Sequence, residues 1–75
     1  MWALKLEYYR TLYFHSYKNA FDTAVAYIIT DIDLWEYFAD DYSKSKGDKE
    51  EWLAERLAQG YGSDIVEIYQ IQFED

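Results

Sequence analysis

The sequence predicts a single small α+β domain, in which a three-stranded antiparallel sheet carries helices packed on one face. Three observations lead to the order β-β-α-α-α-β. Apolar residues alternate near the N-terminus, recur at helical spacing from residue 20 to residue 60, and give way to β-branched and aromatic residues at the C-terminus. The chain has 75 residues, no Pro and only three Gly, so we expect one domain over 1–75 without a long linker.

Residues 2–17 show the period-two pattern of strands. One face would carry the apolar side chains Trp2, Leu4, Leu6, Leu12 and Phe14. The other would carry Lys5, Glu7, Tyr9, Tyr13, His15 and Tyr17. We expect two strands or one bent strand. Because no Gly or Asn marks a hairpin turn between residues 9 and 11, a helix that begins near Tyr9 is the alternative.

The period changes to that of a helix at about Ala20. Asn19 is a suitable N-cap, and Asp22 then lies in the first turn, where negative charge is favourable. The apolar stripe of this helix consists of Phe21, Ala24, Val25, Ile28 and Ile32.

A second apolar stripe follows in residues 33–42, and it consists of Trp35, Phe38, Ala39 and Tyr42. Asp33 and Glu36 have the spacing of a capping box, which predicts a helix start at this point. The alternative is that the first helix continues, with a bend between Thr30 and Asp33.

Residues 43–49 are polar and predict a loop. Asp48 and Glu51 repeat the capping-box spacing, and Gly60 is well placed to end the helix that follows. The predicted buried face of this helix consists of Leu53, Ala54, Leu57 and Ala58. The last segment, 63–75, has the composition of a closing strand.

The net charge of −8 argues against direct binding to nucleic acid or to an anionic membrane. The N-terminus has no signal-peptide pattern, and no apolar run approaches the roughly 18 residues of a membrane span. We therefore expect a cytoplasmic protein. The chain has no Cys, which excludes thiolate metal sites and thiol chemistry.

No pattern in the sequence predicts an enzyme, a cofactor or a metal site. His15 is the single histidine, and its neighbour Ser16 would point to the opposite side of a strand, so the two cannot form a nucleophile–base pair. Counted from Asp31, an EF-hand loop would need Gly where Glu36 stands and Glu where Tyr42 stands. The Asp-x-Asp of residues 31–33 resembles that of aspartate-nucleophile phosphatases, but the chain is too short for their parallel sheet.

The stretch "TDIDLWEYFADDY", residues 30–42, contains five carboxylates and no basic residue. On a helix, Asp33, Glu36 and Asp40 lie within a sector of about 60°, opposite the apolar stripe. A surface that serves only solubility usually mixes both signs of charge. We therefore interpret this face as a binding surface for a protein partner with a basic, nucleic-acid-binding surface. Its candidate residues are Asp31, Asp33, Glu36, Tyr37, Asp40 and Asp41.

In its small size, acidity, lack of Cys and Pro, and surplus of aromatic residues, the chain resembles the small acidic inhibitors that phages encode against host defences. These include anti-CRISPR proteins and anti-restriction DNA mimics. The resemblance implies a non-enzymatic inhibitor acting in the host cytoplasm, and it assigns no individual residue. The alternative function is a homodimer or adaptor that associates through a tyrosine-rich sheet face. The candidate residues of that face are Tyr9, Tyr13, His15 and Tyr17.

Overall fold

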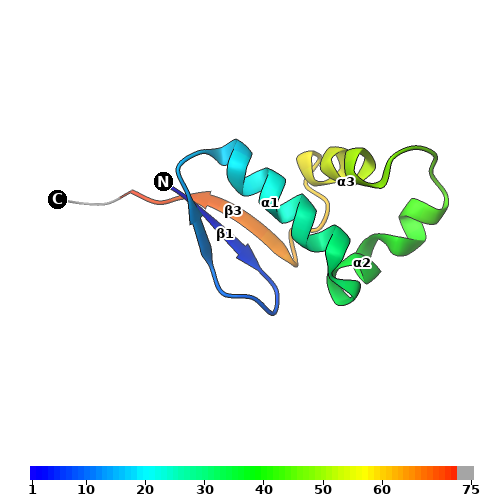
Figure 1. The fold of residues 1–75 in the computed structure, drawn as a ribbon, viewed down its shortest axis with the longest axis horizontal. Helices are drawn as coiled ribbons and strands as arrows, with labels where there is room; N and C mark the ends of the chain where they lie inside the picture. Colours follow the sequence, from blue (N-terminus) through cyan, green and yellow to red (C-terminus); the bar gives the residue numbers. More distant parts are fainter. Residues whose placement is uncertain (73–75) are drawn as a thin grey trace.

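The computed structural model describes residues 1–72, and within this range the element order is the predicted β-β-α-α-α-β (Figure 1). The elements are β1 (Trp2–Leu6), β2 (Leu12–Phe14), α1 (Tyr17–Thr30), α2 (Ile32–Ser43), α3 (Lys49–Ala58) and β3 (Val66–Gln70). Both strand pairs are antiparallel, in the order β2-β1-β3. The α+β fold predicted from the sequence is confirmed. The last three residues of the predicted closing strand lie outside the described range.

The strand register gives the sheet one apolar face and one open face. Leu4 lies between Leu12 and Ile68, and it is fully buried. On the open face Ala3 lies between Tyr13 and Tyr69, whose rings are exposed although Ala3 is buried. The predicted alternation of β1 and β2 is thus confirmed for their apolar side chains.

A tight turn between β1 and β2 replaces the glycine turn that the sequence lacks. The N–H of Tyr9 donates to the carbonyl of Leu6 at 3.1 Å, and Tyr8 between them has a φ of 73°. A positive φ at the third position of such a turn is the type II arrangement, which usually requires Gly. The chain uses Tyr8 instead, so the alternative of a helix that begins near Tyr9 is wrong.

Helix α1 crosses one face of the sheet, whereas α2 and α3 pack against α1, and α2 lies beyond the end of the sheet (Figure 1). Leu4 and Leu6 pack against Ala20 and Ala24 of α1 in the first core cluster. The second cluster joins α1 to α2 and α3 beyond the end of the sheet. Its buried residues are Val25, Ile28, Leu34, Phe38, Leu53 and Ile65. Since α1 belongs to both clusters, it fixes the position of α2 relative to the sheet.

The start of α1 differs from the prediction. Ser16 is the N-cap, and its Oγ accepts a hydrogen bond from the N–H of Asn19 at 3.1 Å. The assignment of Asn19 as N-cap is therefore wrong, and Tyr17, which we placed on the sheet, opens the helix. Asp22 consequently lies beyond the first turn.

A break at Asp31 separates α1 from α2. Asp31 has extended backbone angles, with φ at −103°, and it ends α1 while it caps α2. The two helices are therefore distinct. Ile32, which we placed in the buried stripe of the first helix, is 84% exposed, because the helical phase is interrupted one residue before it.

The boundaries of α3 agree with the capping signals in the sequence. The carboxylate of Asp48 accepts from the N–H of Glu51 at 3.0 Å. At the other end Gly60 has a φ of 93°, and the N–H of Tyr61 reaches back to the carbonyl of Arg56 at 3.1 Å, which is a Schellman motif. The predicted burial of Ala58 is wrong, since it is exposed at the last turn. No helix in the range 1–72 has the length and apolar character that crossing a membrane requires.

Candidate functional site: an acidic surface with exposed tyrosines

Helix α2 separates its charged and apolar side chains as the sequence predicts. Phe38 of the predicted stripe is buried in the second core cluster, and so is Leu34, which the predicted stripe omitted. Trp35 packs edge-on against Trp52 of α3, with ring centroids 6.1 Å apart, which fixes the rotation of α2. The opposite side of the helix is exposed, and it carries Asp33, Glu36, Tyr37, Asp40 and Asp41.

Asp31 has a structural role as well as a charge. It is the N-cap of α2, and one carboxylate oxygen accepts from the N–H of Leu34 at 3.0 Å. The other accepts a hydrogen bond from the hydroxyl of Tyr9. The Tyr9 hydroxyl, and then the Leu34 N–H, lower the pKa of Asp31. The capping role that we assigned to Asp33 and Glu36 therefore belongs to Asp31, and Asp33 lies in the first turn.

The β1–β2 turn is fastened to α2 by a second tyrosine–carboxylate hydrogen bond. The hydroxyl of Tyr37 donates to Glu7 Oε2 at 3.1 Å, and this bond raises the pKa of Tyr37. Together with the bond between Tyr9 and Asp31, it holds the turn against the N-terminal half of α2. Tyr8, at the tip of the turn, remains 73% exposed.

A shallow hollow of about 530 Å³ lies between the turn and the helix, lined by Tyr8, Asp33, Glu36 and Tyr37. Its walls are thus two carboxylates and two tyrosines from segments about 30 residues apart in sequence. Carboxylates accept hydrogen bonds from guanidinium and ammonium groups, and tyrosine rings attract the same cations through their faces. The hollow is therefore suited to lysine and arginine side chains.

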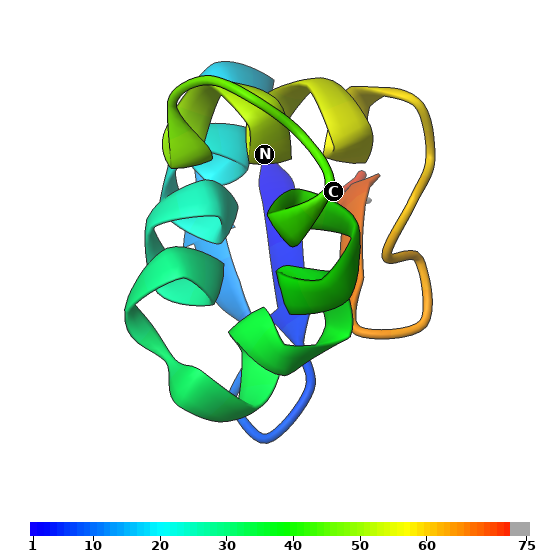
Figure 2. The ribbon, with the colours of Figure 1, turned by 90° about the vertical axis from the view of Figure 1, so that its right-hand side faces the viewer.

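The surface continues on the other side of α2 toward the α3–β3 loop. Tyr37 and Asp41 line a smaller hollow of about 140 Å³ together with Tyr61, Gly62 and Asp64. Figure 2 looks onto this end of the molecule and shows α2 between the β1–β2 turn and the α3–β3 loop. We call the whole region the acidic surface. It consists of Glu7, Tyr8, Asp31, Asp33, Glu36, Tyr37, Asp40, Asp41, Tyr61 and Asp64.

No carboxylate of the acidic surface forms an ion pair with a described residue, although Lys5 lines a hollow with Glu7 and Asp64, and the Arg56 guanidinium lies 5.2 Å from the centre of the Tyr61 ring. Within residues 1–72 the single ion pair joins Lys18 to Asp22 on α1, and both side chains are largely exposed. No group of His, Cys, Asp or Glu in the same range has the arrangement of a metal site. The exposed carboxylates of α2 are therefore not paired with cations of the described residues.

The structure does not bring together the four residues predicted for a tyrosine-rich sheet face. Tyr13 lies on the open face of the sheet, as predicted. Tyr9 belongs to the turn beside α2, and His15 lies in the bend that leads into α1. Tyr17 packs edge-on against Trp2, with ring centroids 5.1 Å apart. The second aromatic residue of the open face is Tyr69, which the prediction omitted, although the alternation of the last strand points to it.

Several residues of the acidic surface were not predicted. Glu7, Tyr8, Tyr61 and Asp64 come from loops that reach α2 only through tertiary packing. One local signal existed, because Tyr61 lies between two glycines, a setting that favours an exposed loop tip. Comparison with known proteins adds no assignment, since no protein-family model, curated protein or solved structure matched the chain.

Proposed function

We propose that the chain is a non-enzymatic binding protein whose acidic surface occupies a basic, nucleic-acid-binding surface of another protein and thereby inhibits it. The observation that carries this proposal is a set of exposed tyrosines and carboxylates around α2 in which no carboxylate within residues 1–72 forms an ion pair. In the cytoplasm of a phage-infected bacterium, an anti-CRISPR or anti-restriction DNA mimic would act in this way.

The spacing of the acids on α2 suits a nucleic-acid-binding groove. Asp33 and Asp40 are seven residues apart, which is about 10 Å along the helix axis. Lysines and arginines that line such a groove could therefore contact Asp33, Glu36 and Asp40 together, and complementary charge accelerates their association.

Exposed tyrosines would supply apolar area that becomes buried in the interface, which the carboxylates cannot provide. Tyr8, Tyr37 and Tyr61 are 73%, 54% and 53% exposed, and they stand among the carboxylates. Tyrosine is enriched in the centres of protein interfaces, where charged residues are depleted. The acids would attract and orient the partner, and the tyrosines would provide the buried area.

The test combines capture with competition. The tagged chain captures proteins from a bacterial lysate at low salt, and a short DNA duplex or an RNA of equal length is then added in excess. We expect nucleic acid to release the captured partner, because the two ligands compete for one basic surface. A raised salt concentration should also weaken capture. Capture that withstands nucleic acid contradicts the proposal.

A pair of matched variants assigns the binding to α2. The first neutralises the predicted face through Asp33→Asn, Glu36→Gln and Asp40→Asn. The control removes the same charge elsewhere through Asp22→Asn, Glu50→Gln and Glu55→Gln. We expect only the first variant to lose capture, after circular dichroism has shown that both variants fold. Equal capture by the two variants would exclude the acidic face of α2 as the contact.

One observation favours self-association as a second candidate function. Tyr13 and Tyr69 stand on either side of Ala3 on the sheet face that no helix within residues 1–72 covers. Light scattering over a range of concentrations tests this candidate, with Tyr13→Ser and Tyr69→Ser as variants. A homodimer predicts a mass that rises with concentration and falls back in the double variant.

A further inference from the structure

Strand β3 presents an open edge on the side away from β1. The carbonyl of Ile65 and the N–H of Ile71 both bond across to the β1 side, each at 2.9 Å. In an antiparallel pair the bonded residues alternate, so Ile68 and Gln70 direct their N–H and C=O groups outward. The other edge strand, β2, has three residues and turns only Tyr13 outward by the same rule. The edge of β3 is thus the longer one.

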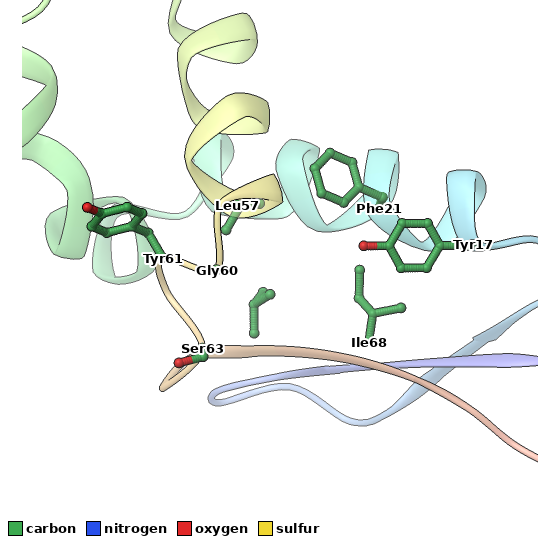
Figure 3. Close-up of a pocket in the computed structure, with 8 residues that line it drawn as sticks. Tyr17, Phe21, Leu57, Gly60, Tyr61, Ser63 and Ile68 are labelled. Atoms are coloured by element: carbon green, nitrogen blue, oxygen red, sulfur yellow. The ribbon is translucent and has the colours of Figure 1, made fainter.

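An apolar cleft of about 130 Å³ lies next to this edge (Figure 3). Tyr17 and Phe21 of α1 lie on one side of it and Ile68 of β3 on the other, while Leu57 and Tyr61 close one end. An apolar cavity of about 150 Å³ admits a benzene molecule. The cleft therefore has room for one aliphatic side chain.

We propose that β3 accepts an extended segment of another protein as an added antiparallel strand, with an aliphatic side chain in this cleft followed by a lysine or arginine. This inference does not depend on the proposed function of the acidic surface. The segment residue opposite Ile68 has its side chain on the same sheet face as Ile68, which is the face of the cleft. Main-chain hydrogen bonds would give affinity, and the cleft would select the side chain.

Charge determines which occupant fits the edge. The next residue of the segment lies opposite Glu67, on the open face, with Asp64 in the preceding loop. Glu67 faces Lys5 across the strand pair, yet the two form no ion pair in the described structure. Lys5 lines one hollow together with the carboxylates of Glu7, Asp64 and Glu67, so the local charge stays negative. A cation on the added strand is therefore attracted to this position, and the net charge of −8 favours a basic segment at long range.

A second copy of the chain fits this edge less well. Two β3 strands paired antiparallel about Ile68 would place Glu67 of each copy opposite Tyr69 of the other, so Glu67 would gain no cation. Each copy also carries the charge of −8, and the two would repel each other. The charges thus favour a basic segment over a homodimer at this edge.

A capped peptide, acetyl-Thr-Thr-Leu-Lys-Val-amide, is the probe. Its leucine is designed to lie opposite Ile68 and its lysine opposite Glu67. In an NMR titration we expect saturable shifts of the amides of Ile68, Gln70 and Leu57. N-methylation of the leucine removes one main-chain hydrogen bond and should weaken binding about ten-fold. Replacement of the lysine by glutamate should also weaken it.

Substitutions at Gln70 test a second main-chain hydrogen bond of the added strand, from the protein side. Because the N–H of Gln70 points outward, Gln70→Pro leaves the ladder to β1 intact and removes a donor to the added strand. Gln70→Val is the control, since it keeps the donor. We expect Gln70→Pro to weaken binding about ten-fold and Gln70→Val to keep it, with both variants giving folded spectra.

Three results would overturn the proposal. The first is that the peptide does not bind at millimolar concentration. The second is binding that N-methylation leaves unchanged, which would mean that the peptide does not add as a strand. The third is a wild-type dimer that Gln70→Pro dissociates, which would make a second copy the occupant of the edge.

Discussion

Tyr8 adopts a backbone conformation that favours glycine, and we predict that Tyr8→Gly stabilises the protein. With φ at 73°, an L-residue is destabilised by about 1–2 kcal/mol relative to the ordinary regions. Glycine avoids this cost but loses more backbone entropy on folding, about 0.5–1 kcal/mol. The ring is 73% exposed, so its removal sacrifices little burial. The free energy of unfolding should therefore rise by about 0.5–1 kcal/mol, which raises Tm by a few degrees in a domain of this size.

Tyr8→Ala is the control, because it removes the same ring but keeps a Cβ at the positive φ. Urea unfolding followed by circular dichroism should rank Tyr8→Gly above Tyr8→Ala by about 1 kcal/mol. If the alanine variant is as stable as the glycine variant, the positive φ of residue 8 does not destabilise the protein, and the prediction is wrong. If the ring also contacts a partner, both variants should bind that partner equally weakly. Gained stability with lost binding would show that the strain is kept for the sake of the exposed ring.

Two further predictions concern the turn and the α3–β3 loop. The hydroxyl of Tyr9 lowers the pKa of Asp31, so this hydrogen bond stabilises the folded protein when Asp31 is ionised. The stabilisation is fully present above the ordinary Asp pKa of about 3.9 and is lost as the pH falls through the lowered pKa of Asp31. Wild type should therefore be more stable than Tyr9→Phe in urea at neutral pH, and a difference that persists at about pH 2 would contradict this assignment. Gly60→Ala should lower the free energy of unfolding by about 1–2 kcal/mol, because residue 60 has a φ of 93° and its Cβ would meet no other atom. Gly62→Ala should cost about 1–3 kcal/mol more, because its Cβ would lie 2.7 Å from the ring of Phe38, and equal Tm values for the two variants would exclude this close contact.

The fold was predictable where local rules act alone, and the errors lie where two rules competed. Helix α3 begins after the N-cap Asp48 and ends before Gly60, as predicted, because no neighbouring residue offers a better cap. Ser16 and Asn19 are both good N-caps, and the end of β2 just before Ser16 decides between them. Ile32 matches the apolar spacing of the first helix, so the sequence pattern places it in the buried stripe. The spacing of apolar residues does not reveal that the backbone leaves the helix at Asp31, one residue earlier.

The candidate site was half predictable for a related reason. The exposed face of α2 follows from helical period, which is a property of one segment. The turn with Tyr8 and the loop with Tyr61 join that face through contacts between segments remote in sequence. The two tyrosine–carboxylate bonds belong to this class, because no spacing rule relates Glu7 to Tyr37 or Tyr9 to Asp31.

Those two bonds support the proposed binding function, because they fasten the turn to α2 without cancelling a charge. A lysine or arginine could fasten the β1–β2 turn to α2 equally well, but it would cancel the charge of the carboxylate it contacts. A tyrosine hydroxyl is neutral, so it orders Glu7 and Asp31 and leaves both charges in place. The two bonds thereby fasten the turn to α2 while Glu7 and Asp31 keep their negative charges. In the proposed function, an ordered turn lowers the entropy lost on association, and the retained charges attract a basic partner.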